Sequence, residues 1–276
     1  MPELPEVETT IRGLRTLMEG RRLKAVDVRT KKLRFPLPPK FAARLAGTRI
    51  LSITRRAKYI LLNLDSGETL LVHLGMSGRM TQVSAKAEPE KHDHIIFTLD
   101  NNKRIAFNDP RRFGVMDLMP ITAHGTHKLL RAIGPEPLGG LTVEHMLTTL
   151  AGKKAPIKNL LLDQRVVAGL GNIYVSEALF HAGIRPTRPG GKITRTEIKK
   201  LVPAIKKVLN AALKAGGTSM RNYVQANGEL GYFQDRFAVY DRENQPCPGC
   251  TCRGKKQVKK IVQGGRSSYF CPVKQS

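Results

Sequence analysis

The pattern of apolar and polar residues changes about halfway along the chain. Up to about residue 120, short apolar runs are separated by turn residues such as Asp65-Ser66-Gly67, as in antiparallel β-strands. Seven such runs predict a β-sandwich or barrel. They cover residues 23–28, 49–56, 58–64, 69–75, 93–99, 104–109 and 114–119.

A helix is predicted before the first strand. Pro5 suits the first helical position, and Glu6 and Glu8 place negative charge where the helix dipole favours it. Apolar residues then recur at helical spacing until Gly20 ends the helix. They are Val7, Ile11, Leu14 and Leu17.

From about Gly134 the apolar period becomes helical. A polar, glycine-punctuated loop over residues 217–234 follows the helical part and is long enough to be functional. The chain ends with a predicted hairpin around Gln263-Gly264-Gly265. The predicted helices cover residues 143–150, 157–164, 172–183 and 194–217.

Together these elements predict an α+β fold in four parts. An N-terminal helix with a two-layer β-sandwich occupies residues 1–120, and a linker covers 121–134. A helical domain follows over 135–235, and a C-terminal β-hairpin region covers 236–276.

The charge of the chain points to nucleic acid. The sequence has 47 Lys and Arg against 22 Asp and Glu, a net charge of +25, and no acidic residue follows Glu243. Such a surface attracts phosphate backbones, although a solvated basic surface without a specific partner would have the same composition. No stretch is apolar enough for a membrane span, and the acidic N-terminus is not typical of a secretory signal, so we expect a cytoplasmic protein.

All four cysteines lie at or after position 247. They are too few and too local to form a disulfide framework for 276 residues. Their close spacing fits a metal site in a reducing cytoplasm instead.

The first residues are a candidate catalytic group. Removal of Met1, which a small second residue usually permits, would leave a secondary amine at Pro2 that can add to an aldehyde or acetal carbon. An α-amino group titrates near ~8, so a nucleophilic fraction exists at neutral pH. Glu3 and Glu6 could serve as acid and base. A plain helix start explains the same residues.

Five motifs in order resemble the bacterial formamidopyrimidine-DNA glycosylase family. They are PELPEVE (2–8), LGMSG (74–78), NDPRRFG (108–114), GPEPL (134–138) and GLGNIYVSEALFHAGI (169–184). The resemblance implies a helix–two-turn–helix repair enzyme that removes oxidised purines, chiefly 8-oxoguanine and formamidopyrimidines, and then cleaves the strand by β- and δ-elimination. Leu4 favours this branch over the oxidised-pyrimidine glycosylases of the endonuclease VIII type, which have Gly there. A non-catalytic DNA-binding protein is the alternative from a different class.

The resemblance also implies catalytic roles. Pro2 would be the nucleophile that attacks C1′ of the damaged nucleotide, Glu3 the acid that assists ring opening, and Glu6 a supporting carboxylate. Lys58 would protonate or steer the departing base and aid elimination. Arg266 of the terminal hairpin would hold the phosphates beside the lesion.

Three further residues are implied to act as a wedge. An enzyme that works on a base inside a duplex must flip the base out and fill the gap. The resemblance places Met76 in the vacated space, Arg111 toward the orphaned cytosine and Phe113 between adjacent pairs. Taken singly, Met76 and Phe113 would more often be core residues.

Other residues are expected to contact the DNA backbone. The turn Gly169–Asn172 opens a helix whose free N–H groups can hold a phosphate. A lone His-x-His pattern at 92–94 is usually not a metal site, and the resemblance implies a DNA contact instead. The implied partner is damaged double-stranded DNA, bound by a monomer because one lesion has no two-fold symmetry. The remaining residues expected to contact DNA are His92, Lys153, Lys154, Lys158 and Asn172.

The cysteine spacing departs from the family at its last pair. The family's finger carries two CxxC pairs, whereas here Lys274 stands at the expected fourth cysteine and Cys252 is additional. We expect one structural zinc ion held by Cys247, Cys250, Cys252 and Cys271, although a C-x-C step is tight for two ligands of one ion. A three-thiolate site, or a hairpin held by packing alone, is the alternative.

Overall fold

The computed structural model describes residues 1–218, 231–252 and 257–276. The chain divides into two compact units, one formed by Met1–Arg131 and Ala215–Tyr232 and the other by Ala132–Lys214 and Phe233–Ser276. The middle of the loop predicted over 217–234 lies outside the described residues, and the division of the chain into four parts stays a prediction.

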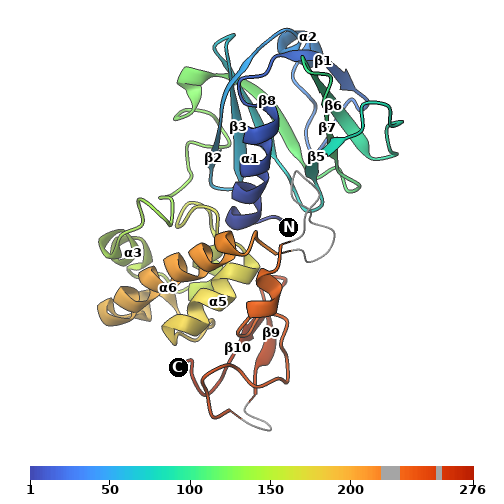
Figure 1. The fold of residues 1–276 in the computed structure, drawn as a ribbon. Helices are drawn as coiled ribbons and strands as arrows, with labels where there is room; N and C mark the ends of the chain where they lie inside the picture. Colours follow the sequence, from blue (N-terminus) through green and yellow to red (C-terminus); the bar gives the residue numbers. More distant parts are fainter. Residues whose placement is uncertain (219–230, 253–256) are drawn as a thin grey trace. The chain divides into compact units, whose positions relative to one another are not determined.

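The first unit is a two-sheet β-sandwich with a long helix, α1 (Leu4–Met18), packed on β2 (Figure 1). Both sheets are antiparallel and four-stranded, in the orders β1-β6-β7-β5 and β2-β3-β4-β8. The strands are β1 (Leu23–Val28), β2 (Ile50–Arg56), β3 (Tyr59–Leu64), β4 (Glu68–His73), β5 (Arg79–Val83), β6 (Asp93–Leu99), β7 (Arg104–Asn108) and β8 (Val115–Pro120).

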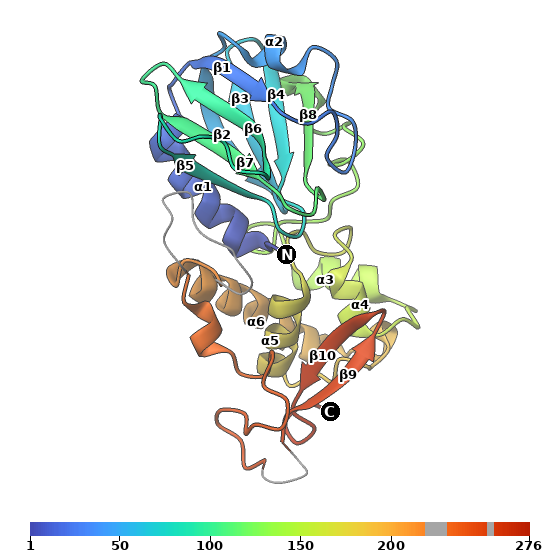
Figure 2. The same ribbon diagram turned by 90° about the vertical axis from the view of Figure 1, so that its right-hand side faces the viewer.

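Helix α1 and both sheets contribute to one apolar core. Figure 2 shows the sandwich from the side of the β1-β6-β7-β5 sheet. Ile11 and Leu14 of α1 are buried in it with Leu62 of β3 and Phe97 of β6. Each such side chain contributes roughly 1.5–3 kcal/mol by leaving water. Leu17, at the edge of the predicted apolar face, is only partly buried.

Two elements of this unit were not expected from the hydrophobic pattern. Strand β5 has one buried residue, Met80, because it is an edge strand that pairs only with β7. Helix α2 (Phe41–Leu45) is too short to show a helical period.

The second unit contains all four predicted helices and the predicted hairpin. Helix α5 packs against α6 and is buried on nearly every side, and Gly183 in the left-handed region (φ 73°) ends it. The longer elements are α3 (Val143–Leu150), α4 (Ile157–Leu162), α5 (Asn172–Ala182), α6 (Arg195–Lys214), β9 (Lys259–Gln263) and β10 (Arg266–Phe270). Short 3₁₀ turns in the chain cover Ile121–Ala123, Gly190–Lys192 and Phe233–Arg236.

The predicted α+β fold is therefore confirmed, with a helix and two sheets followed by a helical part and a terminal hairpin. Within the described residues, no helix is both long and apolar enough to cross a membrane.

Candidate active site and nucleic-acid interface

The predicted catalytic N-terminus is buried and held by the Glu6 carboxylate. Pro2, Glu3 and Glu6 are all buried, and Glu6 Oε2 accepts a hydrogen bond from the Glu3 backbone N–H (2.9 Å). This contact is half of a capping box, which fixes the direction in which the chain enters α1. The N-terminal residues are therefore preorganised by the helix they begin.

The same carboxylate also holds a distant segment. Glu6 Oε1 accepts hydrogen bonds from the Thr218 N–H (2.9 Å) and hydroxyl (3.1 Å). A Cβ on Gly217, whose φ is +79°, would lie 3.0 Å from that oxygen, so glycine is required for the close approach. Glu6 thus connects Glu3 with the start of the loop predicted to be functional.

Lys58 is buried in the turn between β2 and β3. The preceding Ala57 adopts a left-handed backbone (φ 52°), and Arg55, which is paired with Glu8 (2.9 Å), donates to the Ala57 carbonyl (3.0 Å). The lysine is therefore positioned by a turn that the Arg55–Glu8 ion pair supports.

His73, at the end of β4, is a polar residue of this region that the sequence did not single out. Burial, with the neighbouring positive charges of Lys58 and Arg34, lowers the pKa of His73 from 6.5 to about 4. The imidazole is therefore neutral at pH 7, and its Nδ1 accepts a hydrogen bond from the Gly75 N–H (3.0 Å). His73 fixes the start of the loop that carries Met76.

The three predicted wedge residues lie on two loops of the first unit. Met76 and Phe113 are 42% and 43% exposed, so neither is a core residue. The Arg111 guanidinium lies over the Phe113 ring, 4.8 Å from its centroid. Exposed apolar side chains beside an arginine are suited to contact with stacked bases.

The two histidines of the His-x-His pattern at 92–94 have different surroundings. His94 is buried, and its Nε2 lies 2.9 Å from the Asp109 carbonyl oxygen, while His92 is partly exposed. Within the described residues, His92 and His94 belong to no cluster of potential metal ligands.

In the second unit, Arg266 begins β10 and is exposed, as are Lys153 and Lys154. Lys158 is fully buried instead, and its ammonium donates to the Ser267 carbonyl (2.7 Å) and the Ser268 hydroxyl (2.6 Å). The Lys158 ammonium therefore binds to groups of β10 in this structure. A direct contact between Lys158 and a phosphate stays a prediction.

Asn172 is the first residue of α5, as predicted. Its Nδ2 donates to the Ser267 carbonyl (2.9 Å), which links the helix start to the same strand. The N-cap of α5 is Gly171, which has no side chain to cap the helix, and binding of a phosphate at this helix start stays a prediction.

Glu177 of α5 is a second residue that the sequence did not single out. Its buried carboxylate accepts three backbone hydrogen bonds, from Ala238 (2.9 Å), Val239 (2.9 Å) and Tyr240 (2.8 Å). Burial raises the pKa of Glu177, although the three N–H donors oppose the shift. Glu177 anchors the segment that leads from η3 (Phe233–Arg236) toward the cysteines.

The four cysteines come together, with their sulfur atoms all within 4.8 Å of one another. The Cys247 and Cys252 sulfurs are 3.3 Å apart, and those of Cys250 and Cys271 are 3.7 Å apart. Tetrahedral zinc with bonds of about 2.3 Å places its sulfur ligands about 3.8 Å apart. The donor set therefore fits a zinc ion.

The interpretation of Lys274 as a replacement for a missing fourth ligand is wrong. Cys252 supplies the fourth sulfur, and the Lys274 ammonium lies over the Phe180 ring, 4.3 Å from its centroid. The C-x-C step is accommodated because its two sulfurs point to different partners: the Cys252 sulfur lies next to that of Cys247, and the Cys250 sulfur lies next to that of Cys271.

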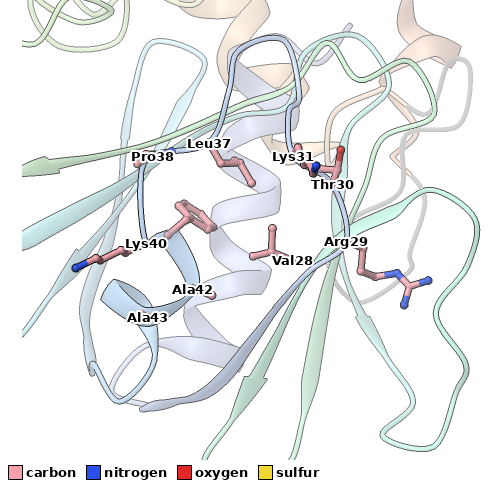
Figure 3. Close-up of a pocket in the computed structure, with 10 residues that line it drawn as sticks. Val28, Arg29, Thr30, Lys31, Leu37, Pro38, Lys40, Ala42 and Ala43 are labelled. Carbon is pink, nitrogen blue, oxygen red and sulfur yellow. The ribbon is translucent and has the colours of Figure 1, made fainter.

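A cavity of ≈ 710 Å³ in the first unit lies beside β1 and α2 (Figure 3). Val28 and Leu37 line it, and the charged ends of Arg29 and Lys40 point away from it. None of the predicted catalytic or DNA-contact residues is among the described residues that line this cavity. The candidate site is therefore separate from this cavity.

Comparison with known proteins places these features in one family. The formamidopyrimidine-DNA glycosylase N-terminal domain matches residues 1–116, and the H2TH domain of the same enzymes matches residues 133–224. Formamidopyrimidine-DNA glycosylases from Roseobacter denitrificans and a Ruegeria species are 55% and 53% identical over 280 residues, 98% of this chain and 98% of each relative.

Solved structures are similar over the whole chain. The Fpg protein from Thermus thermophilus has a TM-score of 0.87 at 39% identity and covers 99% of this chain and 98% of its own. The Lactococcus lactis Fpg in complex with DNA containing an abasic site has a TM-score of 0.91 at 32% identity, with 99% of both chains covered.

These matches define a helix–two-turn–helix DNA repair protein. The chain belongs to the formamidopyrimidine-DNA glycosylase family. The predicted family and the predicted activity, a bifunctional DNA glycosylase and apurinic/apyrimidinic-site lyase, are thereby confirmed.

Proposed function

We propose that the protein removes oxidised purines from double-stranded DNA through a Schiff base on Pro2. The observation that carries the proposal is the Glu6 carboxylate, which holds the backbone of Glu3 and that of Thr218 at once. These two contacts support the proposal because they hold the backbone next to Pro2 in one place, as a positioned nucleophile requires.

In the first step, the Pro2 nitrogen forms a bond to C1′ of the damaged nucleotide. The glycosidic bond breaks, and the base leaves with a proton that Lys58 supplies or steers. Glu3 protonates the ring oxygen as the sugar opens, which produces the iminium. In the β-elimination a C2′ proton is removed and the C3′–O bond breaks, which releases the 3′ phosphate. In the δ-elimination a C4′ proton is removed and the C5′–O bond breaks, which releases the 5′ phosphate. Water then hydrolyses the iminium to an aldehyde and the free Pro2 amine, while Glu6 supports the amine without reacting.

Met76, Arg111 and Phe113 would hold the duplex open while this chemistry proceeds. The exposure of the two apolar side chains supports the role, because a core residue could not enter the base stack. Arg111 would pair with the orphaned cytosine, and His92 would contact the backbone nearby.

The second unit would hold phosphates beside the lesion. Arg266 carries an exposed charge at the start of β10, and Asn172, whose side chain is bonded to the same strand, would lie beside the bound backbone. Lys153 and Lys154 would add non-specific attraction. Lys158 supports this arrangement by its contacts with β10.

A single zinc ion would be held by Cys247, Cys250, Cys252 and Cys271. The ion would supply structural stability and take no part in the reaction, because four thiolates leave no open coordination position. Its binding would fix the loops that flank β9 and β10, and with them Arg266.

Damaged double-stranded DNA is the proposed partner, and one chain would act alone on one lesion. The protein would work in the cytoplasm of a bacterial cell, in contact with the nucleoid. The gathering of all four cysteines at one candidate metal site supports a reducing compartment, where thiolates remain available as ligands.

Strand cleavage of defined duplexes tests the proposed substrate. We expect cleavage at 8-oxoguanine opposite cytosine with phosphates on both new ends, at least tenfold faster than at thymine glycol, and none of an undamaged duplex. Glu3→Gln should abolish excision, and Glu19→Gln, at the far end of α1, should not. A reversed preference would identify an oxidised-pyrimidine glycosylase, and binding without cleavage would identify a non-catalytic DNA-binding protein.

A further inference from the structure

One buried carboxylate joins the two loops that carry the wedge residues. Asp109 follows β7 and is 0% exposed. Its Oδ1 accepts a hydrogen bond from the Ser77 hydroxyl (2.6 Å), and its Oδ2 accepts one from the Gly114 N–H (2.7 Å). Ser77 directly follows Met76, and Gly114 directly follows Phe113. Asp109 therefore touches both loops next to their exposed apolar side chains.

Ser77 strengthens this connection from the other side. Its oxygen accepts a hydrogen bond from the Arg111 N–H (3.3 Å) while its hydroxyl donates to Asp109. A continuous chain of hydrogen bonds thus runs from Arg111 through Ser77 to Asp109. Arg111 belongs to this series of hydrogen bonds, and Met76 and Phe113 are next to residues that belong to it.

Asp109 itself is fixed by the neighbouring strand. Its N–H donates to the His92 carbonyl (3.0 Å), and its own carbonyl oxygen lies 2.9 Å from His94 Nε2 and accepts from the Arg112 N–H (3.1 Å). The carboxylate is therefore a rigid attachment point for the two loops.

The backbones of the two loops also touch directly. A Cβ on Gly75, whose φ is +65°, would lie 2.5 Å from the Phe113 carbonyl carbon and 2.6 Å from the Gly114 nitrogen. These distances are too short for any side chain, so glycine is required where the Met76 loop meets the Phe113 loop.

We propose that Asp109 and Ser77 are positioning residues that make the two wedge loops insert into DNA as one unit. The proposal rests on the proposed function, since it needs Met76, Arg111 and Phe113 to enter the duplex. Opening a base step costs energy, and ordering two independent loops at the same moment would add conformational entropy to that cost. Loops already joined by Asp109 avoid the second cost.

The variant Ser77→Ala tests the proposal with two substrates. It removes one partly exposed hydroxyl, and we expect excision of 8-oxoguanine from duplex DNA to slow about tenfold. Cleavage of a single-stranded oligonucleotide with an abasic site needs the Pro2 amine but no wedge, and should stay within about twofold of wild type. Ser77→Thr keeps the hydroxyl and should restore duplex excision. Asp109→Ala should show the same selective loss, and Ser77→Ala keeps the test valid if that variant does not fold.

A double-mutant cycle separates positioning from general stability. In a Met76→Ala/Phe113→Ala background, adding Ser77→Ala should change the duplex rate less than about twofold, because the side chains it positions are gone. An equal loss on both substrates, or unchanged duplex excision in Ser77→Ala, would overturn the proposal. If wild-type protein cleaves neither substrate, the proposed function itself fails, which is a distinguishable result.

Discussion

The proposed catalytic N-terminus and the cysteine cluster hold their functional groups by different means. Glu6 fixes the N-terminal residues with hydrogen bonds to Glu3 and Thr218, all supplied by the chain itself. The four cysteine sulfurs instead face one another, at distances such as 3.3 and 3.7 Å. Thiolates so close repel one another unless a cation lies between them. The first site is therefore preorganised by the fold, whereas the second would depend on a bound cation.

The largest expected effect comes from blocking the N-terminus. An N-terminal extension converts the Pro2 amine into an amide, so strand cleavage should fall at least about 10³-fold. Binding to damaged duplex should change less than about threefold, because affinity rests on phosphate contacts. Cleavage and gel-shift assays on one preparation measure both, and an extended protein with normal cleavage would exclude Pro2 as the nucleophile.

The next largest effect is expected when one cysteine of the cluster is replaced. Cys252→Ser should lower bound zinc from about one ion per chain to well below one, and should weaken DNA binding about tenfold because Arg266 loses its support. The matched control is Lys274→Ala, which should keep its zinc because the Lys274 ammonium lies on the Phe180 ring. Metal analysis of the purified variants decides, and full zinc content in Cys252→Ser would contradict the four-cysteine site.

A third measurement compares the two regions by the salt dependence of DNA binding. If about five phosphates are neutralised, the logarithm of the DNA association constant should fall with the logarithm of the salt concentration at a slope of roughly −4 to −5. Arg266→Ala should reduce the magnitude of that slope by about one, whereas the N-terminal extension should leave it unchanged. A flat slope for the wild-type protein would show that the basic surface does not contact the DNA.

The smallest effect is a pH dependence of stability in the first unit. Because the pKa of His73 is lowered from 6.5 to about 4, the folded state keeps the ring neutral while the unfolded state takes up a proton below pH 6.5. His73 therefore contributes stability above pH 6.5 that is lost as the pH falls toward 4. Between pH 7 and pH 5, the free energy of unfolding measured in urea should fall less for His73→Gln than for wild type. Equal losses would show that His73 is not the group responsible.

Local patterns predicted most of the fold. The four helices predicted after Gly134 all lie in the second unit, and an apolar period of 3.6 residues is clear in the sequences of α3 and α6. Strand β5 was missed because only Met80 of that strand is buried. An edge strand needs no apolar pattern, so its existence depends on pairing with β7, which the sequence does not show.

The candidate site was predictable only where a motif carried it. The resemblance supplied Pro2, Met76 and Arg266, whereas His73, Asp109 and Glu177 were not singled out. Those three act through hydrogen bonds that only the folded chain shows: His73 accepts from the Gly75 N–H, Asp109 from Ser77 and Gly114, and Glu177 from three N–H groups of a distant segment. The Lys274 interpretation was wrong for the same reason, because spacing alone does not show which sulfur reaches a cluster.

Borohydride trapping followed by peptide mapping tests the central claim most directly. Reduction during reaction with duplex containing 8-oxoguanine should link the protein to DNA one to one. The linked peptide should begin at Pro2, with no Met1, and carry the sugar on the proline nitrogen. A trapped complex on a lysine such as Lys58, or no complex despite DNA cleavage, would contradict the account.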